Sequence, residues 1–379
     1  MKKKILITYA SYGSGHKTVA NYIYDYFKEH GGDKYEVKVI DVMDYASLLG
    51  RLTVKIFNIN FIIPNSIPST ISYELTDNKI ITKPYRIYTK ACLNKKLQSD
   101  LLEYNPDILI ATHFFGGIMM GSINKKYHTD TKIITIITDY SSNCMWLQNH
   151  KYEDYIVVSN DIVKQELLKF GVDEKKICPF GIPLSSKFKK LDEKNKIKIK
   201  YNITNDKPII LFFGGGSMGS SFSFKYLKVL LKLNLDYNII FVSGKNVELQ
   251  NKVNNYIEEE NIKNIIVLGF TSDVSNLLNI ANLVITKPGG LSVTEALEMK
   301  TPMILIPGNG GQENYNAKFV TKNKFGIWIH NPFGFTRVMK KIKNNPDIVK
   351  DMYKNLKYYE ENKSVEKLFN LVEGELKWK

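Results

Sequence analysis

The sequence has few cysteines and no long apolar run. Its three cysteines, Cys92, Cys144 and Cys178, show no paired spacing, which argues against a disulfide scaffold and indicates a reducing, cytoplasmic setting. No apolar stretch approaches the roughly 20 residues that a membrane-spanning helix requires, so we expect no span. Basic residues 2–4 before apolar residues 5–7 resemble the start of a signal peptide, but the apolar run is short and we interpret it as a first strand.

Two familiar phosphate-binding signatures are absent as well. Residues 11–17 form a glycine-rich turn between a strand expected at 4–9 and a helix expected at 18–27, an arrangement typical of phosphate cradles. The turn lacks the third glycine of the dinucleotide fingerprint and the Gly-Lys-Ser/Thr ending of a triphosphate loop. It offers His16 instead, at a helix start whose positive end favours the neutral imidazole. His16 is therefore a candidate general base, and the alternative is a histidine that caps the helix.

Positive charge is what the sequence has in excess. With 53 lysines and arginines against 38 aspartates and glutamates, its 379 residues carry a net charge of +15. This balance favours an acidic partner, namely nucleic acid, an anionic membrane surface or an anionic substrate, unless it only reflects a lysine-rich composition. The lysines are dispersed and are not interleaved with aromatic residues in a known module, so we do not expect nucleic acid as the partner.

The most informative stretch lies at residues 281–317. Two short apolar runs flank a helical pattern there, which predicts a β-α-β unit. The Lys-Pro-Gly-Gly turn at 287–290 lets the backbone approach a ligand, and Ser292 stands at the expected start of the helix. The N–H groups of a helix start attract phosphate, Lys287 adds a positive charge, and Glu295 is a candidate acceptor for the hydroxyls of a sugar. The alternative is an ordinary capped helix after a strand.

The pattern of a strand followed by a glycine loop occurs twice in the chain. A strand expected at 208–213 and a glycine loop at 214–221 repeat the arrangement of the first half, which predicts two Rossmann-like domains facing each other. We place the first domain at 1–186, a charged linker at 187–207 and the second domain at 208–379. The last helix of the second domain is a candidate for packing back on the first.

Two polar side chains follow buried strands of the first half, and ligands in open parallel sheets bind at the carboxyl ends of strands. His113 follows one such strand, and Asp139 follows the next strand along the chain. We expect His113 to lie beside the loop that carries His16, the alternative being a core or surface histidine. Asp139 is expected to orient a histidine or to bind a substrate.

Residues 45–68 form an apolar stretch with interspersed arginine and lysine. The stretch is long for a connection and short for a membrane span. It favours a segment at the interface of an anionic membrane, and a buried helix pair is the alternative.

Several motifs together carry a family resemblance. They are Gly13-Ser14-Gly15-His16, Thr112-His113, Thr138-Asp139 with Trp146, Gly214 to Ser217, Lys287 to Glu295, and Gln312-Glu313 with Asn316. In their order and spacing, the chain resembles the processive diacylglycerol glycosyltransferases and the plant-type monogalactosyldiacylglycerol synthases over nearly its whole length. Its second half also resembles the bacterial N-acetylglucosaminyltransferase that makes lipid II. The resemblance implies an α/β fold of GT-B type, with two Rossmann-like domains facing across a cleft.

The resemblance also implies substrates and site residues. A hexose would pass from UDP-glucose or UDP-galactose in the second domain to diacylglycerol in the first. The chain would lie peripherally on the inner face of the cell membrane and need no cofactor. His16 would act as the base or place the acceptor hydroxyl, with His113 and Asp139 as further catalytic residues. The donor would contact Gly215, Ser217, Phe270, Lys287, Gly289, Gly290, Ser292, Glu295, Gln312 and Glu313.

Two features bear on how such a reaction would proceed. Family members usually have a histidine a few residues after the Thr-Asp pair, where this chain has Asn143, which affects the expected acceptor contacts. No Asp-x-Asp pair occurs in the chain, so we expect no metal. The helix start at Ser292 with Lys287 would stabilise the leaving diphosphate instead, and direct attack by the acceptor would invert the anomeric centre.

Three other functions fit parts of the sequence. The first is transfer of the sugar to another lipid carrier, such as a polyprenyl-linked cell-wall precursor. The second is nucleotide-sugar epimerisation, which needs no membrane contact and does not explain residues 45–68. The third is binding of nucleotide sugars without catalysis, which does not explain His16 or Glu295.

Overall fold

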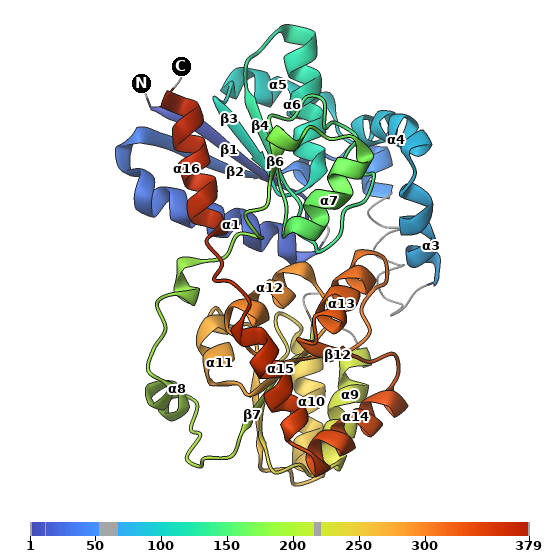
Figure 1. The fold of residues 1–379 in the computed structure, drawn as a ribbon, viewed down its shortest axis with the longest axis vertical. Helices are drawn as coiled ribbons and strands as arrows, with labels where there is room; N and C mark the ends of the chain where they lie inside the picture. The colour runs from blue at the N-terminus through green and yellow to red at the C-terminus, as the bar shows by residue number, and fades with distance from the viewer. Residues whose placement is uncertain (1, 12, 53–66, 216–220, 378–379) are drawn as a thin grey trace. The chain divides into compact units, whose positions relative to one another are not determined.

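The chain forms two compact units, each built around its own parallel sheet (Figure 1). The structure is a computed structural model that describes residues 2–11, 13–52, 67–215 and 221–377. The first unit contains the described residues up to 186 and residues 362–377, and the second contains the described residues from 187 to 361. Two Rossmann-like units were expected from the two strand–glycine loop–helix repeats, and this fold class is confirmed.

The sheet of the first unit has six parallel strands in the order β2-β1-β3-β4-β5-β6. Their apolar residues are buried, so both faces of the sheet are covered, as parallel sheets require. Strand β1, second in this order, pairs with β2 on one side and with β3 on the other. The strands are β1 Lys3–Tyr9, β2 Tyr35–Asp41, β3 Ile108–Ala111, β4 Lys132–Ile136, β5 Tyr155–Val157 and β6 Ile177–Cys178.

Seven labelled α-helices accompany this sheet, and described residues 48–52 are helical as well. The labelled helices are α1 Ser14–Gly31, α3 Ile67–Thr76, α4 Lys79–Ala91, α5 Lys95–Tyr104, α6 Phe114–Tyr127, α7 Asp161–Phe170 and α16 Ser364–Lys377. Helix α6 packs closely on β1 and β4 because glycines face the sheet. A Cβ at Gly116 would overlap the Thr8 side chain, and one at Gly117 would lie 3.0 Å from the Thr135 hydroxyl. No described helix is both long and apolar enough to cross a bilayer.

The second unit repeats the architecture with the strand order β12-β11-β10-β7-β8-β9. Its strands are β7 Ile209–Phe213, β8 Asn238–Val242, β9 Ile265–Leu268, β10 Leu283–Thr286, β11 Met303–Leu305 and β12 Gly326–Trp328. Its helices are α8 Lys194–Lys200, α9 Ser221–Lys232, α10 Val247–Glu259, α11 Val274–Ile280, α12 Gly290–Glu298, α13 Gln312–Lys322, α14 Pro332–Asn344 and α15 Asp347–Lys357. A separate core forms around residues such as Phe212, Phe241 and Phe335.

The boundaries of the units depart from simple halves at two places. Residues 187–207, interpreted above as a linker, include helix α8 and belong to the second unit. Helix α16, which the sequence placed at the end of the domain 208–379 as a candidate for packing back on the first domain, belongs to the first unit, so the second unit ends at Glu361. The reason is apolar packing: the Phe369 ring lies 5.0 Å from that of Phe27 and 6.1 Å from that of Tyr35.

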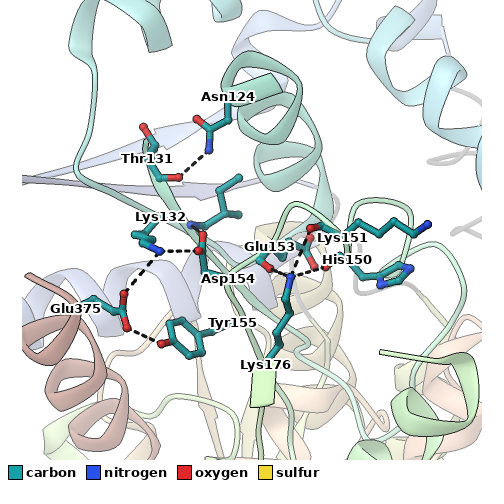
Figure 2. A network of polar contacts seen from close by, with 11 residues as sticks. Asn124, Thr131, Lys132, His150, Lys151, Glu153, Asp154, Tyr155, Lys176 and Glu375 are labelled. Carbon is teal, nitrogen blue, oxygen red and sulfur yellow. Dashed lines mark hydrogen bonds and ion pairs between the residues drawn. The ribbon is translucent and has the colours of Figure 1, made fainter. Parts of the chain in front are cut away.

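Polar contacts fasten α16 to the sheet (Figure 2). Lys132 donates to the Asp154 carboxylate at 2.9 Å and lies 4.0 Å from the carboxylate of Glu375 on α16. Tyr155 donates a hydrogen bond to the same Glu375 carboxylate. Because Lys132 begins β4 and Tyr155 begins β5, the helix is held across two neighbouring strands of the first unit.

A buried carboxyl lies in the same region of the first unit. The Glu153 side chain accepts from the Thr135 hydroxyl at 3.0 Å, and its other oxygen has no partner among the described residues. Lys176, in Figure 2, donates at 2.7 Å to the backbone oxygen of Glu153 and not to its carboxylate. Burial therefore raises the pKa of Glu153 from 4.5 to about 8.

This pKa predicts how stability depends on pH. Between pH 4.5 and 8 the folded state holds a proton on Glu153 that the unfolded state releases, so stability falls as pH rises through that window. Glu153→Gln cannot ionise and still offers an oxygen to Thr135. From pH 5 to pH 8, the free energy of unfolding of wild type should fall by on the order of 4 kcal/mol more than that of the variant. Denaturant titrations at both pH values measure it, with Glu103→Gln as an exposed control. Equal pH dependence in wild type and Glu153→Gln would contradict the prediction.

Candidate active site

His16 lies in the first turn of α1, directly after β1 and the glycine turn. The helix begins at Ser14, four residues before the expected start, because Gly13 adopts a positive φ of 96° and ends the turn early. The start of α1 has no side-chain cap, and a Cβ at Gly13 or Gly15 would meet no described atom within 4 Å. The backbone beside His16 is therefore open enough for another molecule to approach.

The contacts of His16 fix its tautomer. Its Nδ1 lies 2.7 Å from the carbonyl oxygen of Thr112 and 3.2 Å from the hydroxyl of Thr138. A carbonyl oxygen only accepts, so Nδ1 donates to it and the neutral ring keeps its lone pair on Nε2. None of the hydrogen bonds among the described residues engages Nε2. The ring is partly exposed, yet burial lowers the pKa of His16 to about 4. His16 is therefore neutral at physiological pH and presents Nε2 as a proton acceptor.

His113 lies beside His16, as the strand-end pattern predicts. The two rings are edge to face with centroids 5.0 Å apart, and Trp146 lies 6.2 Å from His16 and 6.0 Å from His113. His113 is the N-cap of α6, and its Nδ1 accepts from the backbone N–H of Phe115 at 3.4 Å. Burial, and to a lesser extent His16, hold the pKa of His113 well below its usual value. Its visible role is to cap α6 and to form one wall around His16.

Asp139 is buried near the end of the strand, and its expected role in orienting a histidine or binding a substrate stays a prediction. The hydrogen bonds of His16 go to Thr112 and Thr138, the residues that immediately precede His113 and Asp139 in the sequence. Sequence reasoning therefore identified the correct strand ends and missed the two threonines that contact the imidazole. The Thr-His and Thr-Asp pairs could have indicated these contacts. Successive residues near a strand end point to opposite sides, so if one residue of a pair does not face His16, its neighbour can.

Asn143, where the resemblance led us to expect a histidine, makes structural contacts. Its side-chain amide donates to the backbone oxygen of Tyr73 at 3.0 Å, and its oxygen accepts from the N–H of Met145 at 2.9 Å. Next to it, the N–H of Cys144 donates to the Asp77 carboxylate at 2.9 Å. These contacts tie the segment after Asp139 to the end of α3. Asn143 thus positions the chain around Trp146.

In the second unit, the positive end of a helix lies where the Lys-Pro-Gly-Gly turn predicts it. The expectation that the helix starts at Ser292 was two residues late, since α12 begins at Gly290 with Gly289 as its N-cap. No side chain caps this start. The first-turn N–H groups of Gly290, Leu291 and Ser292 therefore remain for an anion. The Asn316 amide donates to the Pro288 oxygen at 3.0 Å and holds the turn against α13.

Lys287 is positioned beside this helix start by an acidic partner. Its ammonium lies 3.8 Å from one oxygen of Glu313, and the other oxygen accepts from the N–H of Asn309 at 2.6 Å. A Cβ at Gly308 would overlap the Glu313 carboxylate, so glycine is needed there for the acid to approach. Glu313 was expected to contact sugar hydroxyls; in the structure its carboxylate also holds Lys287 and the 307–311 loop.

The other expected donor residues belong to the same unit. Glu295 is buried in the second turn of α12. Gln312 begins α13 and is partly exposed. Phe270 is 69% exposed, with the Lys245 ammonium 5.2 Å from its ring centroid. Gly215 has a φ of 107°, which favours glycine, whereas Ser217 lies outside the described residues. Among the residues that the structure describes, no cluster of three histidine, cysteine or acidic side chains is arranged to hold a metal.

Two family models match the chain, one in each half. Residues 16–184 match the monogalactosyldiacylglycerol (MGDG) synthase model. Residues 209–368 match the glycosyltransferase family 28 C-terminal domain. The first match begins at His16 and includes both threonines that contact it. The second includes the uncapped start of α12 together with Lys287 and Glu313.

Curated relatives cover nearly the whole chain. A protein of Bacillus pumilus named processive diacylglycerol beta-glucosyltransferase is 28% identical over 94% of this chain and 90% of its own length. Proteins of the same name are 28% identical in Bacillus subtilis, over 94% of this chain and 91% of the relative, and 25% identical in Staphylococcus aureus, over 92% and 87%.

Solved structures share the fold at low sequence identity. MurG of Acinetobacter baumannii superposes with a TM-score of 0.63 at 12% identity, covering 98% of this chain and 99% of the other. MnaA of Staphylococcus aureus, solved with UDP, gives a TM-score of 0.65 at 14% identity, covering 99% and 97%. These likenesses identify the fold as GT-B. The two family models and the curated relatives show that the chain is a glycosyltransferase, similar over nearly its whole length to the processive diacylglycerol glycosyltransferases and the monogalactosyldiacylglycerol synthases.

Proposed function

We propose that the chain transfers a hexose from UDP-glucose or UDP-galactose to diacylglycerol, with inversion and without a metal, on the inner face of the cell membrane. The observation that carries this proposal is the tautomer of His16, a residue that directly follows the open Gly13–Gly15 backbone and whose Nε2 makes no hydrogen bond among the described residues. The names of the relatives support diacylglycerol as the acceptor.

In the proposed reaction, Nε2 of His16 takes the proton of the diacylglycerol hydroxyl as its oxygen attacks the anomeric carbon of the sugar. A new C–O bond forms on one face while the bond to the diphosphate oxygen breaks on the other, so the configuration inverts. The Thr112 carbonyl, 2.7 Å from Nδ1, is positioned to stabilise the imidazolium that results. UDP leaves with the bonding electron pair.

The leaving diphosphate gains negative charge, and the second unit offers fixed positive groups to receive it. The uncapped N–H groups of α12 and the ammonium of Lys287 are already oriented before any charge develops. Such preorganised donors need little rearrangement during the reaction, which makes them an effective substitute for a divalent cation.

Contact with the membrane is supported by an exposed apolar face on the first unit. Along α4, Ile80 and Ile87 are 81% and 64% exposed, and Pro84 between them is exposed as well. These positions are four and three residues apart and therefore share one side of the helix. Leu48 and Leu75 are exposed in the same unit. An amphipathic helix with such a face suits the boundary between lipid head groups and acyl chains.

The proposal is tested by offering each labelled UDP-sugar with vesicles that contain diacylglycerol, and separately with a polyprenyl phosphate-linked acceptor. We expect label from UDP-glucose or UDP-galactose in a glycosyl diacylglycerol, with an anomeric configuration opposite to that of the donor. Label that enters only the polyprenyl product would replace diacylglycerol with another lipid carrier. Label in no lipid from any donor would refute lipid glycosylation altogether.

A further inference from the structure

The first unit contains a cavity that the proposed reaction does not use. It has a volume of about 510 Å³, within the usual range for small-molecule sites, and lies among α4, α5, α6 and the loop that carries Tyr152. Its α6 lining runs from Met119 to Lys126, whereas His113 caps the opposite, N-terminal end of that helix. The cavity is therefore distinct from the cluster around His16.

The charged side chains that line this cavity are all cations. Arg86, Lys90, Lys95, Lys125 and Lys126 all contribute, and no aspartate or glutamate does. None of the ion pairs among the described residues involves any of these five side chains. Five cations that share one cavity without a carboxylate are mutually repulsive, so an anion that enters it would relieve the repulsion.

The electrostatic consequences are visible on two side chains. Burial first, and then the charges of Arg86 and Lys125, lower the pKa of Lys90. A hydrogen bond from Lys125, with further influence from Arg86 and Lys90, lowers the pKa of Tyr152. The field of the cavity thus disfavours another positive charge and favours a negative one. Part of this arrangement has a local cause, because Lys125 and Lys126 lie in the last turn of α6, where cations suit the helix dipole. Lys90, in the last turn of α4, has the same local cause, whereas Arg86 and Lys95, the first residue of α5, are not explained in that way.

Neutral donors complete the lining. The amides of Asn94 and Gln98 reach the cavity alongside the cations; Gln98 donates one amide hydrogen to the Tyr127 hydroxyl at 2.8 Å and retains the other. Arginine forks, ammonium groups and neutral donors around one space are the combination that proteins use for phosphate groups. The exposed apolar side of α4 adjoins the flank that carries Arg86 and Lys90, about 100° away around the helix. This placement makes a phospholipid one natural source of the phosphate.

We propose that this cavity is a second ligand site, separate from the transferase site, which binds a phosphate-bearing anion. The inference that the cavity binds a phosphate group depends only on the residues that line it. Only the identification of a membrane phospholipid as its source rests on the proposed function at the membrane.

The test measures binding and requires no turnover. Full-length protein is mixed with neutral phosphatidylcholine vesicles, with vesicles that also contain phosphatidylglycerol, and separately with soluble glycerophosphoglycerol and inorganic phosphate. Lys90→Gln with Lys125→Gln removes two cavity cations, and Lys169→Gln with Lys175→Gln removes two exposed lysines of the same unit as a charge-matched control. We expect the cavity pair to weaken anion binding at least tenfold and the control pair less than twofold. Lys90→Arg with Lys125→Arg retains both charges and should bind within threefold of wild type, and thermal unfolding verifies that each variant is folded.

The two sources give different results. Tight binding to phosphatidylglycerol vesicles, lost in the cavity pair and competed by glycerophosphoglycerol, supports a lipid phosphate. Binding of soluble phosphate that is lost in the cavity pair, without vesicle binding, supports the site and assigns it a soluble ligand. If the cavity pair and the control pair lose equal affinity in every arm, the inference is overturned. The binding assay contains neither donor nor diacylglycerol. Its result can therefore be interpreted even if the protein proves not to glycosylate lipids.

Discussion

Replacing His16 with alanine is expected to lower turnover by about 10²- to 10⁴-fold and to leave UDP-sugar binding unchanged. The reason is the geometry of the imidazole, whose Nδ1 is held by Thr112 while Nε2 retains the lone pair. The proposed donor-binding residues belong to the other unit, so loss of His16 should remove the proposed proton acceptor without altering their contacts. Initial rates with labelled donor and calorimetric binding of UDP-sugar separate the two effects.

His30→Ala is the matched control, because His30 ends the same helix and lies far along it from the His16 cluster. It should alter the rate by less than twofold. The pH profile adds an independent readout: with a pKa of about 4, His16 stays neutral well below pH 6.5. The acidic limb of wild-type turnover should therefore lie near pH 4. A His16→Ala enzyme with the normal rate would exclude His16 as the base.

Lys287→Met is expected to reduce turnover by roughly 10²- to 10³-fold, with a smaller change in donor affinity. Lys287 stands beside the uncapped start of α12 and is held there by Glu313. A charge aimed at the leaving diphosphate stabilises the transition state more than the ground state, so kcat falls more than binding. Addition of EDTA to the wild-type enzyme should leave turnover unchanged.

Lys322→Met, which removes an exposed charge from α13, controls for the loss of one cation in the same unit. Glu313→Gln separates position from charge: if Glu313 orients Lys287, this variant should show an intermediate loss. Full activity of Lys287→Met, or abolition of wild-type turnover by EDTA that added Mg²⁺ restores, would show that a metal and not the ammonium stabilises the leaving group.

The fold class was predictable from the sequence because its signals are local. Apolar runs of strand length alternate with helical patterns, and each half begins with a glycine loop. The starts of helices were less predictable. Both α1 and α12 begin earlier than expected, at Ser14 and Gly290, because no capping side chain marks their starts in the sequence: the residue before each helix is a glycine, Gly13 with a positive φ and Gly289 with an extended conformation.

The details of the site depended on contacts between distant residues. His16 and His113 were expected to meet, since strand ends of a parallel sheet share one edge. Thr138 contacts His16 because its side chain faces that side of the strand end. The two residues are 122 positions apart in the sequence, so no local pattern predicts the contact. The attachment of Glu313 to Lys287 likewise rests on the loop at Gly308. The basic cavity combines three helices and a loop, whose relative placement no local pattern encodes.

The return of α16 to the first unit has a consequence for biosynthesis. Leu368 and Val372 are fully buried, and Phe369 packs on Phe27, so the helix fills part of that unit's interior. The ribosome makes residues 364–377 only after the whole second unit has been translated. The first unit therefore lacks α16 and exposes the apolar surface that this helix covers until the second unit has been synthesised. Nascent chains stalled before residue 364 should bind chaperones through their N-terminal portion.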